Sequence, residues 1–322
     1  MFKRTQLIKR ELFYWRKALF EYKKFWAYIY YKYIFSKKIL DKNEILERPV
    51  NNPDLSVHIL TCHFDFKMFF WSLASYYNAF KIYGQLYIHN DGTLSPKEIN
   101  LIKKFFPSAR IIDARTFAND FENKLNQYPV FKSIRARHFN FFSFKKIIDT
   151  FLAADNKMCL IFDTDILWFK NPIDIEEQIK LGCPRSLMQK NNTYKFLKDG
   201  AEIDQQLTQF NAGIILYARE NFDTNILIDF FQQLNENNKK ELHFADQTGH
   251  VKCLKNLSAL PEDKYIIRGS VNENTVAKHY TAPRRPLFYL EGMKKLTNLF
   301  CHPRKSENPM ELQDSRVRGN DI

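Results

Sequence analysis

Glycine is scarce in this sequence: it accounts for 9 of the 322 residues. Neither the Gly-x-Gly-x-x-Gly pattern of dinucleotide-binding folds nor the Gly-x-x-x-x-Gly-Lys-Ser/Thr pattern of phosphate-binding loops is present. Both patterns need glycine because the backbone must approach a phosphate group closely. Their absence argues against a Rossmann-type dehydrogenase and against a P-loop nucleotide hydrolase.

Paired cysteines and long apolar runs are also missing. The five cysteines are widely spaced and form no Cys-x-x-Cys pair, which predicts a reducing compartment and no zinc site. The first forty residues lack the apolar core of a signal peptide. The longest uncharged aromatic run, residues 25–31, is too short to cross a bilayer. These absences predict a cytoplasmic protein.

Positive charge is abundant but uneven. The net charge is +13, and residues 1–50 hold 13 Lys and Arg against 5 Asp and Glu, a local excess of 8 that leaves +5 for the rest. A basic balance concentrated in one segment is unlike the extended basic surface of a nucleic-acid-binding protein. Nucleic acid is therefore not an expected partner, and a nucleic-acid binder is the weakest of the alternative functions.

That basic segment also has the pattern of a long amphipathic helix over residues 2–40. Apolar residues recur there in alternating steps of four and three, which places them on one helix face. They are Ile8, Leu12, Trp15, Leu19, Tyr22, Trp26, Ile29 and Tyr33. Aromatic residues and cations together are typical of a helix that lies in a membrane interface. Two interpretations stay open: peripheral contact with the inner face of a membrane, or a helix that packs on the following domain or forms a coiled-coil arm.

The remainder divides into one large domain and a tail. A polar stretch with Pro49 and Pro53 reads as a linker, so residues 1–50 form the basic helix with its linker. Residues 51–302 form the main domain. Residues 303–322 have few apolar positions and no period, which predicts a disordered tail.

Strands and helices alternate within the main domain. Apolar strand patterns occur at residues 57–61, 85–89, 110–113 and 158–162, with helical patterns at 65–80 and 139–154 between them. Ser95, Pro96 and Glu98 together form a strong helix start, with a capping serine and a proline in the first turn. This alternation predicts an α/β fold with a mainly parallel central sheet and helices on both faces.

The most informative stretch joins the apolar strand 158–162 to two carboxylates, Asp163 and Asp165. In open α/β sheets, ligands bind at the carboxyl ends of the strands. Two carboxylates at that position suit a hard divalent cation, which retains several waters and is completed by substrate phosphates. The alternative is a strand end whose aspartates only cap a turn or the next helix.

Four motifs in order resemble a known family. They are Asp163-Thr-Asp165, Phe210-Asn-Ala-Gly213, Asp246-Gln247 and the late His279. Over residues 56–300 the chain resembles a GT-A glycosyltransferase, nearest to the family-eight-like group of glycogenin and bacterial galactosyltransferases. Residues 279–292 look like a segment of poorly characterised bacterial members. The family's usual His-x-x-Gly-x-x-Lys-Pro-Trp motif is not reproduced, so the diphosphate contacts depart from the family pattern more than the metal site does.

The resemblance implies a metal site and a sugar site. Asp165, Asp163 and His279 would bind Mn2+ or Mg2+. Asn211, Ala212 and Gly213 would line the sugar site, because small residues let a substrate approach the backbone and Asn both donates and accepts. Without the resemblance, His279 reads as a packed histidine on a β segment and Gly213 as part of the packing where a strand begins.

Asp246 and Gln247 resemble the pair below the donor sugar and are the expected catalytic residues. A carboxylate there would hold sugar hydroxyls or stabilise positive charge at the anomeric carbon, and its alternative role is a helix cap. Further donor contacts are expected from cations and strand ends. These are Lys146, preferred over Lys145, with Arg137 as a neighbour; Arg284, beside Arg285; and Thr61 and Asp91.

The sequence therefore predicts a metal-dependent glycosyltransferase that uses a nucleoside-diphosphate sugar donor and an unidentified acceptor: a surface glycan, lipid or protein. A divalent cation would neutralise the charge that develops on the leaving diphosphate. Two alternatives stay open. One is a catalytically degenerate module that only binds a nucleotide sugar, and the other is a metal-dependent nucleotidyltransferase.

Overall fold

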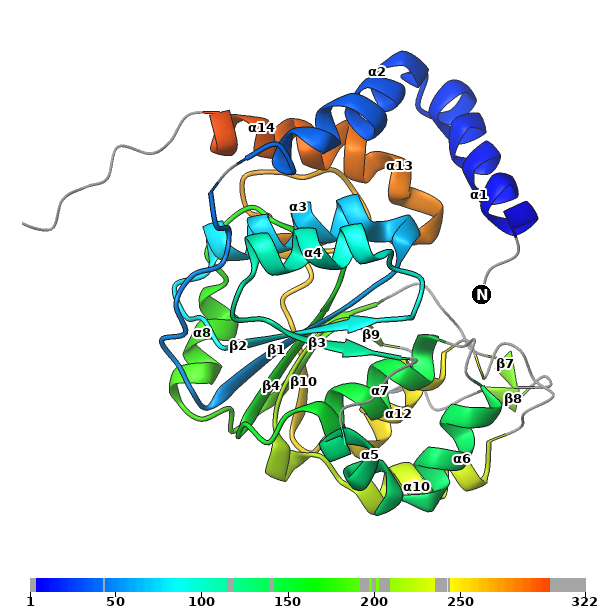
Figure 1. The fold of residues 1–322 in the computed structure, drawn as a ribbon, viewed down its shortest axis with the longest axis vertical. Coiled ribbons are helices and arrows are strands. Elements are labelled where there is room, and N and C mark those ends of the chain that lie inside the picture. Colours follow the sequence, from blue (N-terminus) through cyan, green and yellow to red (C-terminus); the bar gives the residue numbers. More distant parts are fainter. Residues whose placement is uncertain are drawn as a thin grey trace, which may run out of the picture.

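A computed structural model describes residues 4–42, 44–114, 119–138, 142–191, 197–198, 201–202, 209–234, 242 and 244–301. It shows an α/β protein with helices on both faces of a central sheet (Figure 1). The fold class predicted from the sequence is thus confirmed. The tail over residues 303–322 and the first residues of the predicted helix 139–154 lie outside the described residues.

The central sheet has seven strands in the order β10-β6-β9-β4-β1-β2-β3. They are β1 (Leu55–Thr61), β2 (Gln85–Asn90), β3 (Arg110–Asp113), β4 (Met158–Asp163), β6 (Ser186–Lys190), β9 (Phe210–Ala218) and β10 (Leu257–Ala259). The pairs β3–β2, β2–β1, β1–β4 and β6–β10 are parallel, whereas β9 runs antiparallel to β4 and β6. The four strands expected from the apolar patterns are all present.

Helices cover the two faces in two groups. One face carries α3 (Phe66–Ala79), α4 (Pro96–Phe105), α8 (Ile173–Lys180) and the last helical segments, α13 (Arg285–Leu287), η7 (Phe288–Met293) and α14 (Lys294–Cys301). The other carries α5 (Asn119–Asn126), α6 (Pro129–Arg137), α7 (Phe142–Ala153), α10 (Thr224–Gln232) and α12 (Ala245–Cys253). Helix α4 begins at the expected Ser95 cap, which forms a reciprocal capping box with Glu98.

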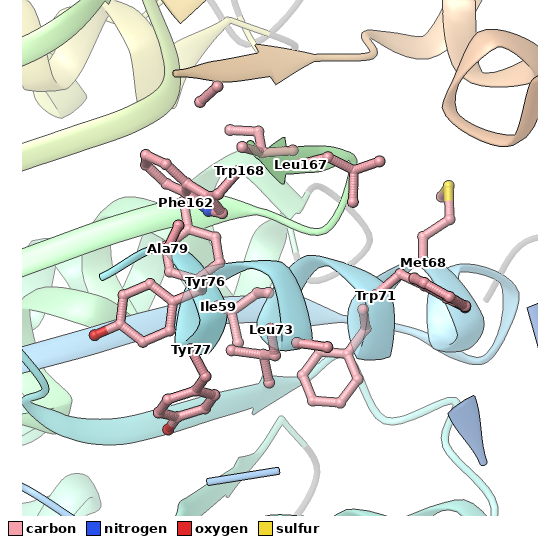
Figure 2. Packing of buried hydrophobic residues seen from close by; sticks show 14 of the residues in the cluster. Ile59, Met68, Trp71, Leu73, Tyr76, Tyr77, Ala79, Phe162, Leu167 and Trp168 are labelled. Carbon is pink, nitrogen blue, oxygen red and sulfur yellow. The ribbon is translucent and has the colours of Figure 1, made fainter. Parts of the chain in front are cut away.

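Aromatic side chains pack the first face, which explains the high phenylalanine and tyrosine content. Tyr76 of α3 stacks on Phe162 of β4 with ring centroids 5.3 Å apart, and Phe162 meets Trp168 edge to face at 5.7 Å (Figure 2). Trp168 belongs to β5 (Ile166–Trp168), directly after the two aspartates. Because these rings are fully buried, β4 and the turn that carries Asp163 and Asp165 rest on a tightly packed base.

A small second sheet lies beside this turn. It has the order β11-β12-β5, where β11 is Tyr265–Ile266 and β12 is Ala277–His279. Strand β12 runs antiparallel to β5, with His279 opposite Ile166. This pairing spans more than 110 residues of sequence and brings the late histidine next to the acidic turn. A two-stranded hairpin, β7 (Leu197–Lys198) and β8 (Ala201–Glu202), completes the described strands.

The N-terminal segment is not the single long helix that the sequence predicts. Helix α1 (Arg4–Arg16) continues as a π-helical turn η1 (Lys17–Glu21), and the chain then breaks at Lys23, whose φ is +51°. Helix α2 (Phe25–Ile29) and the segments η2 (Tyr30–Ile34) and η3 (Phe35–Ile39) follow in a new direction (Figure 1). A non-glycine residue in the left-handed region ends a helix, and the regular apolar spacing gave no sign of it.

The part of the chain that the structure describes contains no helix with both the length and the apolarity needed to cross a bilayer. The segment packs on the main domain instead. The ring of Phe35 stacks on Trp71 of α3 with centroids 5.5 Å apart, and the Trp71 indole donates to the Ser36 carbonyl. Tyr28 meets Tyr289 of η7 at 5.8 Å.

Two buried histidines join β1 to β2. His58 Nδ1 lies 2.9 Å from His89 Nε2, and the other ring nitrogen of each residue has no hydrogen-bond partner among the described residues. Burial disfavours the charged imidazolium. It therefore lowers the pKa of His89 to about 3 and lowers the pKa of His58 well below the ordinary value. Both side chains are neutral in the folded protein at neutral pH.

We expect acid to destabilise the fold through this pair. The folded pKa values lie below the unfolded value of about 6.5, so the stability contribution is complete above that pH and is lost as the pH falls toward 3. At pH 4.5, His89 alone should cost about 3 kcal/mol. Urea unfolding at pH 7.5 and 4.5 measures the effect, which should shrink in the double variant His58→Leu, His89→Leu. An unchanged difference in that variant would contradict the assignment.

Candidate functional site

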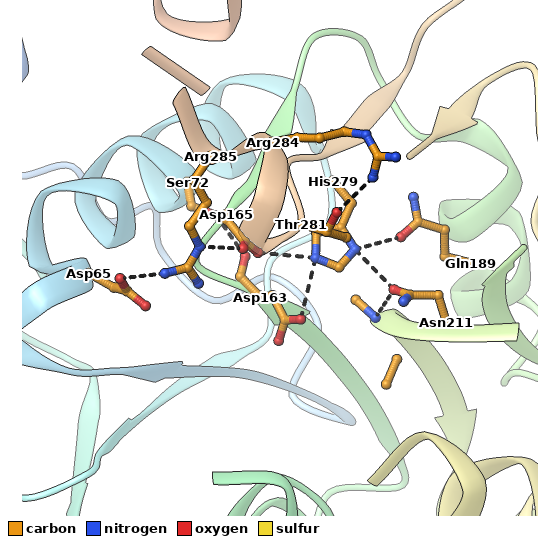
Figure 3. A network of polar contacts seen from close by, with 12 residues as sticks. Asp65, Ser72, Asp163, Asp165, Gln189, Asn211, His279, Thr281, Arg284 and Arg285 are labelled. Carbon is orange, nitrogen blue, oxygen red and sulfur yellow. Dashed lines mark hydrogen bonds and ion pairs between the residues drawn. The ribbon is translucent and has the colours of Figure 1, made fainter. Parts of the chain in front are cut away.

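Three of the predicted residues meet at the carboxyl end of β4. Asp163, Asp165 and His279 each present a ligand atom within 4.8 Å of the others. His279 Nε2 lies 3.1 Å from Asp165 Oδ1 and 3.7 Å from Asp163 Oδ2 (Figure 3). Asp165 and His279 are buried, whereas the side chain of Asp163 is 31% exposed. The cluster therefore opens to solvent on the Asp163 side.

The other nitrogen of His279 is held by two side-chain amides. His279 Nδ1 lies 3.0 Å from Asn211 Oδ1 and 3.2 Å from Gln189 Oε1. The orientation of each amide is fixed: Gln189 Nε2 donates to the carbonyls of Tyr265 and Ile266, and Asn211 Oδ1 accepts from the Gly213 amide. Since both amides present oxygen to Nδ1, that nitrogen carries the proton.

The protonation of Nδ1 decides what Nε2 can do. In the neutral ring Nε2 is then an acceptor, and its lone pair faces carboxylate oxygens of Asp163 and Asp165. Three acceptor atoms that face one another repel unless a cation lies among them. Adjacent ligands of an octahedral Mg2+ at about 2.1 Å are themselves about 3 Å apart, and opposite ligands are about 4.2 Å apart. Both separations from His279 Nε2 fall within this range. The residues present therefore fit a hard divalent cation.

Arg285 of α13 supports the cluster from behind. Its Nε donates to Asp165 Oδ2 at 3.0 Å, and its Nη1 donates to Asp65 Oδ1 at 2.8 Å (Figure 3). Burial alone would raise the pKa of Asp165, and the positive charge and hydrogen bond of Arg285 lower it. Asp165 is thus held as a carboxylate, with one oxygen toward Arg285 and the other toward His279.

Lys146 of α7 joins the metal cluster to the predicted catalytic pair. Its Nζ donates to Asp163 Oδ1 at 2.6 Å and to the Ala212 carbonyl at 2.5 Å, and it lies 3.8 Å from Asp246 Oδ2. Burial alone would lower the pKa of Lys146, but Asp163, Asp246 and Asp165 together raise it. A buried ammonium therefore links the two acidic residues.

Gly213 stands where no side chain fits. A Cβ on this residue would lie 2.3 Å from His279 Nδ1 and 2.8 Å from Asn211 Oδ1. Such separations are far below van der Waals contact. The Asn-Ala-Gly step of β9 therefore admits the imidazole into the space beside the strand and supplies its hydrogen-bond acceptor.

The remaining predicted residues fall into two groups. Some are buried or hydrogen-bonded near the carboxyl ends of the strands, and the others are the arginines. Thr61, at the end of β1, and Gln247, in the first turn of α12, are buried. The Gln247 Nε2 and Thr61 Oγ1 atoms have no hydrogen-bond partner among the described residues. Asp91, after β2, accepts from the amide and hydroxyl of Thr93. Unsatisfied buried polar atoms at a strand edge are what a bound ligand would satisfy.

The two other predicted arginines form no described hydrogen bond or ion pair with Asp163, Asp165 or His279. Arg284 bonds to the Thr281 hydroxyl at 3.1 Å, so the adjacent Arg285 and not Arg284 contacts Asp165 in this structure. Arg137 lies on the exposed side of α6 and lines a cavity of about 420 Å3 between α6 and α10. None of the residues that line this cavity belongs to the acidic cluster.

Sequence reasoning missed Gln189 and Asp65. Gln189 lies on β6, which was not among the expected strands, and it reaches His279 only through the pairing of β6 with β9. Asp65 was placed at the start of a helix, and nothing in the sequence relates it to Arg285, 220 residues later. A polar residue at the end of an apolar strand was the one available signal for Gln189.

Because Gln189 faces His279 Nδ1, its loss should weaken metal binding. Gln189→Met keeps the length of the side chain but removes the acceptor that faces His279 Nδ1. We expect the affinity for Mn2+ to fall about 10- to 100-fold, because hydrogen-bonded partners of a ligating histidine contribute on that scale. Calorimetric titration of the metal measures it, and a circular dichroism spectrum checks the fold. An unaltered affinity would show that Asn211 alone orients the ring.

Comparison with known proteins supports the fold. No family profile and no curated protein sequence matches the chain. Among solved structures, the bifunctional glycosyltransferase WbbM matches with a TM-score of 0.52 and 13% identity over 80% of this chain and 51% of that chain. The galactosyltransferase LgtC, crystallised with donor and acceptor sugar analogues, gives 0.44 and 14% over 70% and 87%. Mouse xyloside xylosyltransferase 1 gives 0.47 and 11% over 71% and 98%.

At 13% identity, the match to WbbM shows a shared fold and nothing finer. The chain has the GT-A glycosyltransferase fold, as its sequence predicts. The finer assignment to the family-eight-like group stays a prediction.

Proposed function

We propose that this protein is a metal-dependent glycosyltransferase that moves a sugar from a nucleoside-diphosphate donor to an acceptor. The observation that carries the proposal is the convergence of ligand atoms of Asp163, Asp165 and His279 at the end of β4. The GT-A fold supports the reaction class by analogy. When bound, Mn2+ or Mg2+ would supply positive charge to the leaving diphosphate.

The residues around the cluster suggest a division of roles. Lys146 keeps Asp163 and Asp246 close together despite their like charge, because its ammonium lies within 4 Å of both. Asp246 would then face the donor sugar and stabilise positive charge at its anomeric carbon. Gln247 would donate from its unsatisfied Nε2 to a sugar hydroxyl.

The donor would extend from Asp163, Asp165 and His279 across the carboxyl ends of the central strands. Asn211, Ala212 and Gly213 would line the sugar, and Thr61 and Asp91 would contact the nucleoside. Arg284 is the proposed diphosphate contact, because Arg285 is already committed to Asp65 and Asp165. Arg137 is proposed as a more distant contact. Guanidinium groups suit such contacts because they bind phosphate oxygens in pairs.

A thermal-shift panel tests the proposal. Nucleoside-diphosphate sugars with different bases and sugars are added with Mn2+ or with EDTA. We expect at least one donor to raise the melting temperature only when metal is present, because ligands that bind the folded state stabilise it. The products of a longer incubation then identify the reaction.

The outcomes separate the three functions. Release of nucleoside diphosphate in the presence of metal supports a glycosyltransferase. Release of a sugar 1-phosphate from the donor, or of pyrophosphate when a nucleoside triphosphate is supplied, would indicate a nucleotidyltransferase instead. Donor binding that ignores EDTA, with no turnover, would favour a catalytically degenerate binding module.

A further inference from the structure

The apolar residues of the N-terminal segment are divided between two faces. The residues that pack on the domain are Tyr14, Ala18, Tyr28, Phe35 and Ile39, all of which are buried. Most of the regular stripe predicted from the sequence lies on the other side. Ile8, Leu12, Trp15, Leu19 and Trp26 are 52%, 54%, 36%, 47% and 80% exposed. The stripe is therefore not the docking face of the segment.

This outward side is a concentrated apolar surface. Of the fourteen large hydrophobic residues that are exposed in the described part of the chain, nine lie between Ile8 and Ile34. Figure 1 shows α1 and α2 at the periphery of the molecule, beyond α3 and α13. Scattered exposed apolar residues are normal on a protein, but a cluster of this kind marks an interaction surface.

Cations surround the same surface. Six exposed basic residues lie in the described segment: Lys9, Arg16, Lys23, Lys24, Lys37 and Lys38. Over residues 7–40 the one exposed acid is Glu21, and it is paired with Lys17 at 2.5 Å. Exposed tryptophan and leucine beside lysine suit the interface of an anionic bilayer, where apolar side chains enter the acyl boundary and ammonium groups stay with the headgroups.

The segment is anchored to the domain close to the acidic cluster. The Arg10 guanidinium lies 3.5 Å from the centroid of the Phe64 ring, which adjoins Asp65. Burial raises the pKa of the Tyr14 hydroxyl, and the positive charge of Arg285, which donates to Asp65 and Asp165, opposes that shift. A partner bound through α1 would therefore be held to the domain that carries Asp163, Asp165 and His279.

We propose that the outward face of residues 8–34 docks the protein on an anionic lipid bilayer. Its apolar stripe inserts at the level of the headgroups, and the flanking lysines and arginines bind lipid phosphates. No bilayer-spanning helix is involved. The proposal concerns where the protein works and does not depend on sugar transfer, so it can fail or succeed independently of the proposed reaction.

The test uses the full chain and vesicles of phosphatidylcholine with and without phosphatidylglycerol. Sedimentation measures partitioning, and fluorescence reports insertion, because Trp15 and Trp26 are exposed whereas Trp71 and Trp168 are buried. We expect binding to the anionic vesicles, a shift of tryptophan emission to shorter wavelength, and at least tenfold weaker binding to the neutral vesicles. Each basic residue at an anionic surface contributes about fivefold.

Three variants sharpen the result. Leu12→Gln with Leu19→Gln and Trp26→Gln should weaken anionic binding at least tenfold and remove the emission shift. Lys9→Gln with Lys24→Gln should weaken it about 25-fold and reduce its salt dependence. The matched control is Leu181→Gln, because Leu181 is 70% exposed but lies elsewhere on the domain; it should bind as the unmodified chain does.

Two outcomes would overturn the proposal. One is that the unmodified chain does not bind anionic vesicles, or that the triple apolar variant binds them as strongly as the unmodified chain does. The other is a chain that self-associates in gel filtration and becomes monomeric in that variant without any vesicle binding, which would make this face an interface between copies.

Discussion

Replacing Asp165 by asparagine is expected to abolish both metal binding and turnover. The change keeps the shape of the side chain but removes the charge from the most buried of the three ligand-bearing residues. The stabilisation of a folded protein by Mn2+ should disappear, and metal-dependent donor hydrolysis should fall at least about 10^3-fold, because a metal supplies several kcal/mol of charge stabilisation. Differential scanning fluorimetry with Mn2+ and a nucleoside-diphosphate release assay measure the two effects.

The control for this variant is Asp155→Asn. The side chain of Asp155 is 77% exposed and pairs with Lys124 at 2.6 Å. Its substitution by asparagine removes the same charge at the surface, where the loss of an ion pair has little effect on stability. It should keep the full response to metal. Undiminished metal response in Asp165→Asn would remove the physical basis of the proposed function.

Gly213→Ala is expected to disrupt the metal site, although Gly213 is not one of its proposed ligands. The new Cβ would lie 2.3 Å from His279 Nδ1 and 2.6 Å from His279 Cε1. Since β9 is a central strand with neighbours on both sides, the imidazole must move instead of the backbone. We expect an overpacking cost of about 1–3 kcal/mol in the free energy of unfolding. We also expect an affinity for Mn2+ at least about tenfold weaker, because the ring loses its orientation.

A second glycine separates the two effects. A Cβ on Gly84 would lie 2.3 Å from the Leu55 carbonyl oxygen, where β1 begins and far along the strand from the metal cluster. Gly84→Ala should therefore destabilise the fold while the folded fraction keeps its affinity for metal. If both variants lose metal binding in proportion to stability, the effect of Gly213→Ala is not specific to His279.

Local patterns were sufficient for the elements that form the base of the site. The apolar run 158–162 predicted β4 because a strand buried on both faces has to be apolar throughout. Ser95 and Glu98 predicted the start of α4 because a capping box is satisfied within four residues. In both cases the controlling interactions lie close together in the sequence.

The N-terminal segment shows where local pattern fails. Its apolar period identified residues that share a helix face, and Ile8, Leu12 and Trp15 do share one. The periodicity of apolar residues does not reveal whether that helix face packs against the domain or faces solvent. Tyr14, Ala18 and Tyr28 are the buried residues instead, and the break at Lys23 turns α2 so that Tyr28 meets Tyr289 of η7.

The sequence by itself determined that two carboxylates follow a buried strand of an α/β protein. The resemblance to GT-A glycosyltransferases had proposed His279 as their partner, but only the tertiary structure showed how it reaches them. It also showed that Gln189 and Asn211 hold its Nδ1 and that Arg285, not Arg284, contacts Asp165. The physical reason is that these contacts depend on non-local strand pairing, β12 with β5 and β6 with β9. Such pairing is selected by the packing of the whole chain and leaves no mark in the spacing of neighbouring residues.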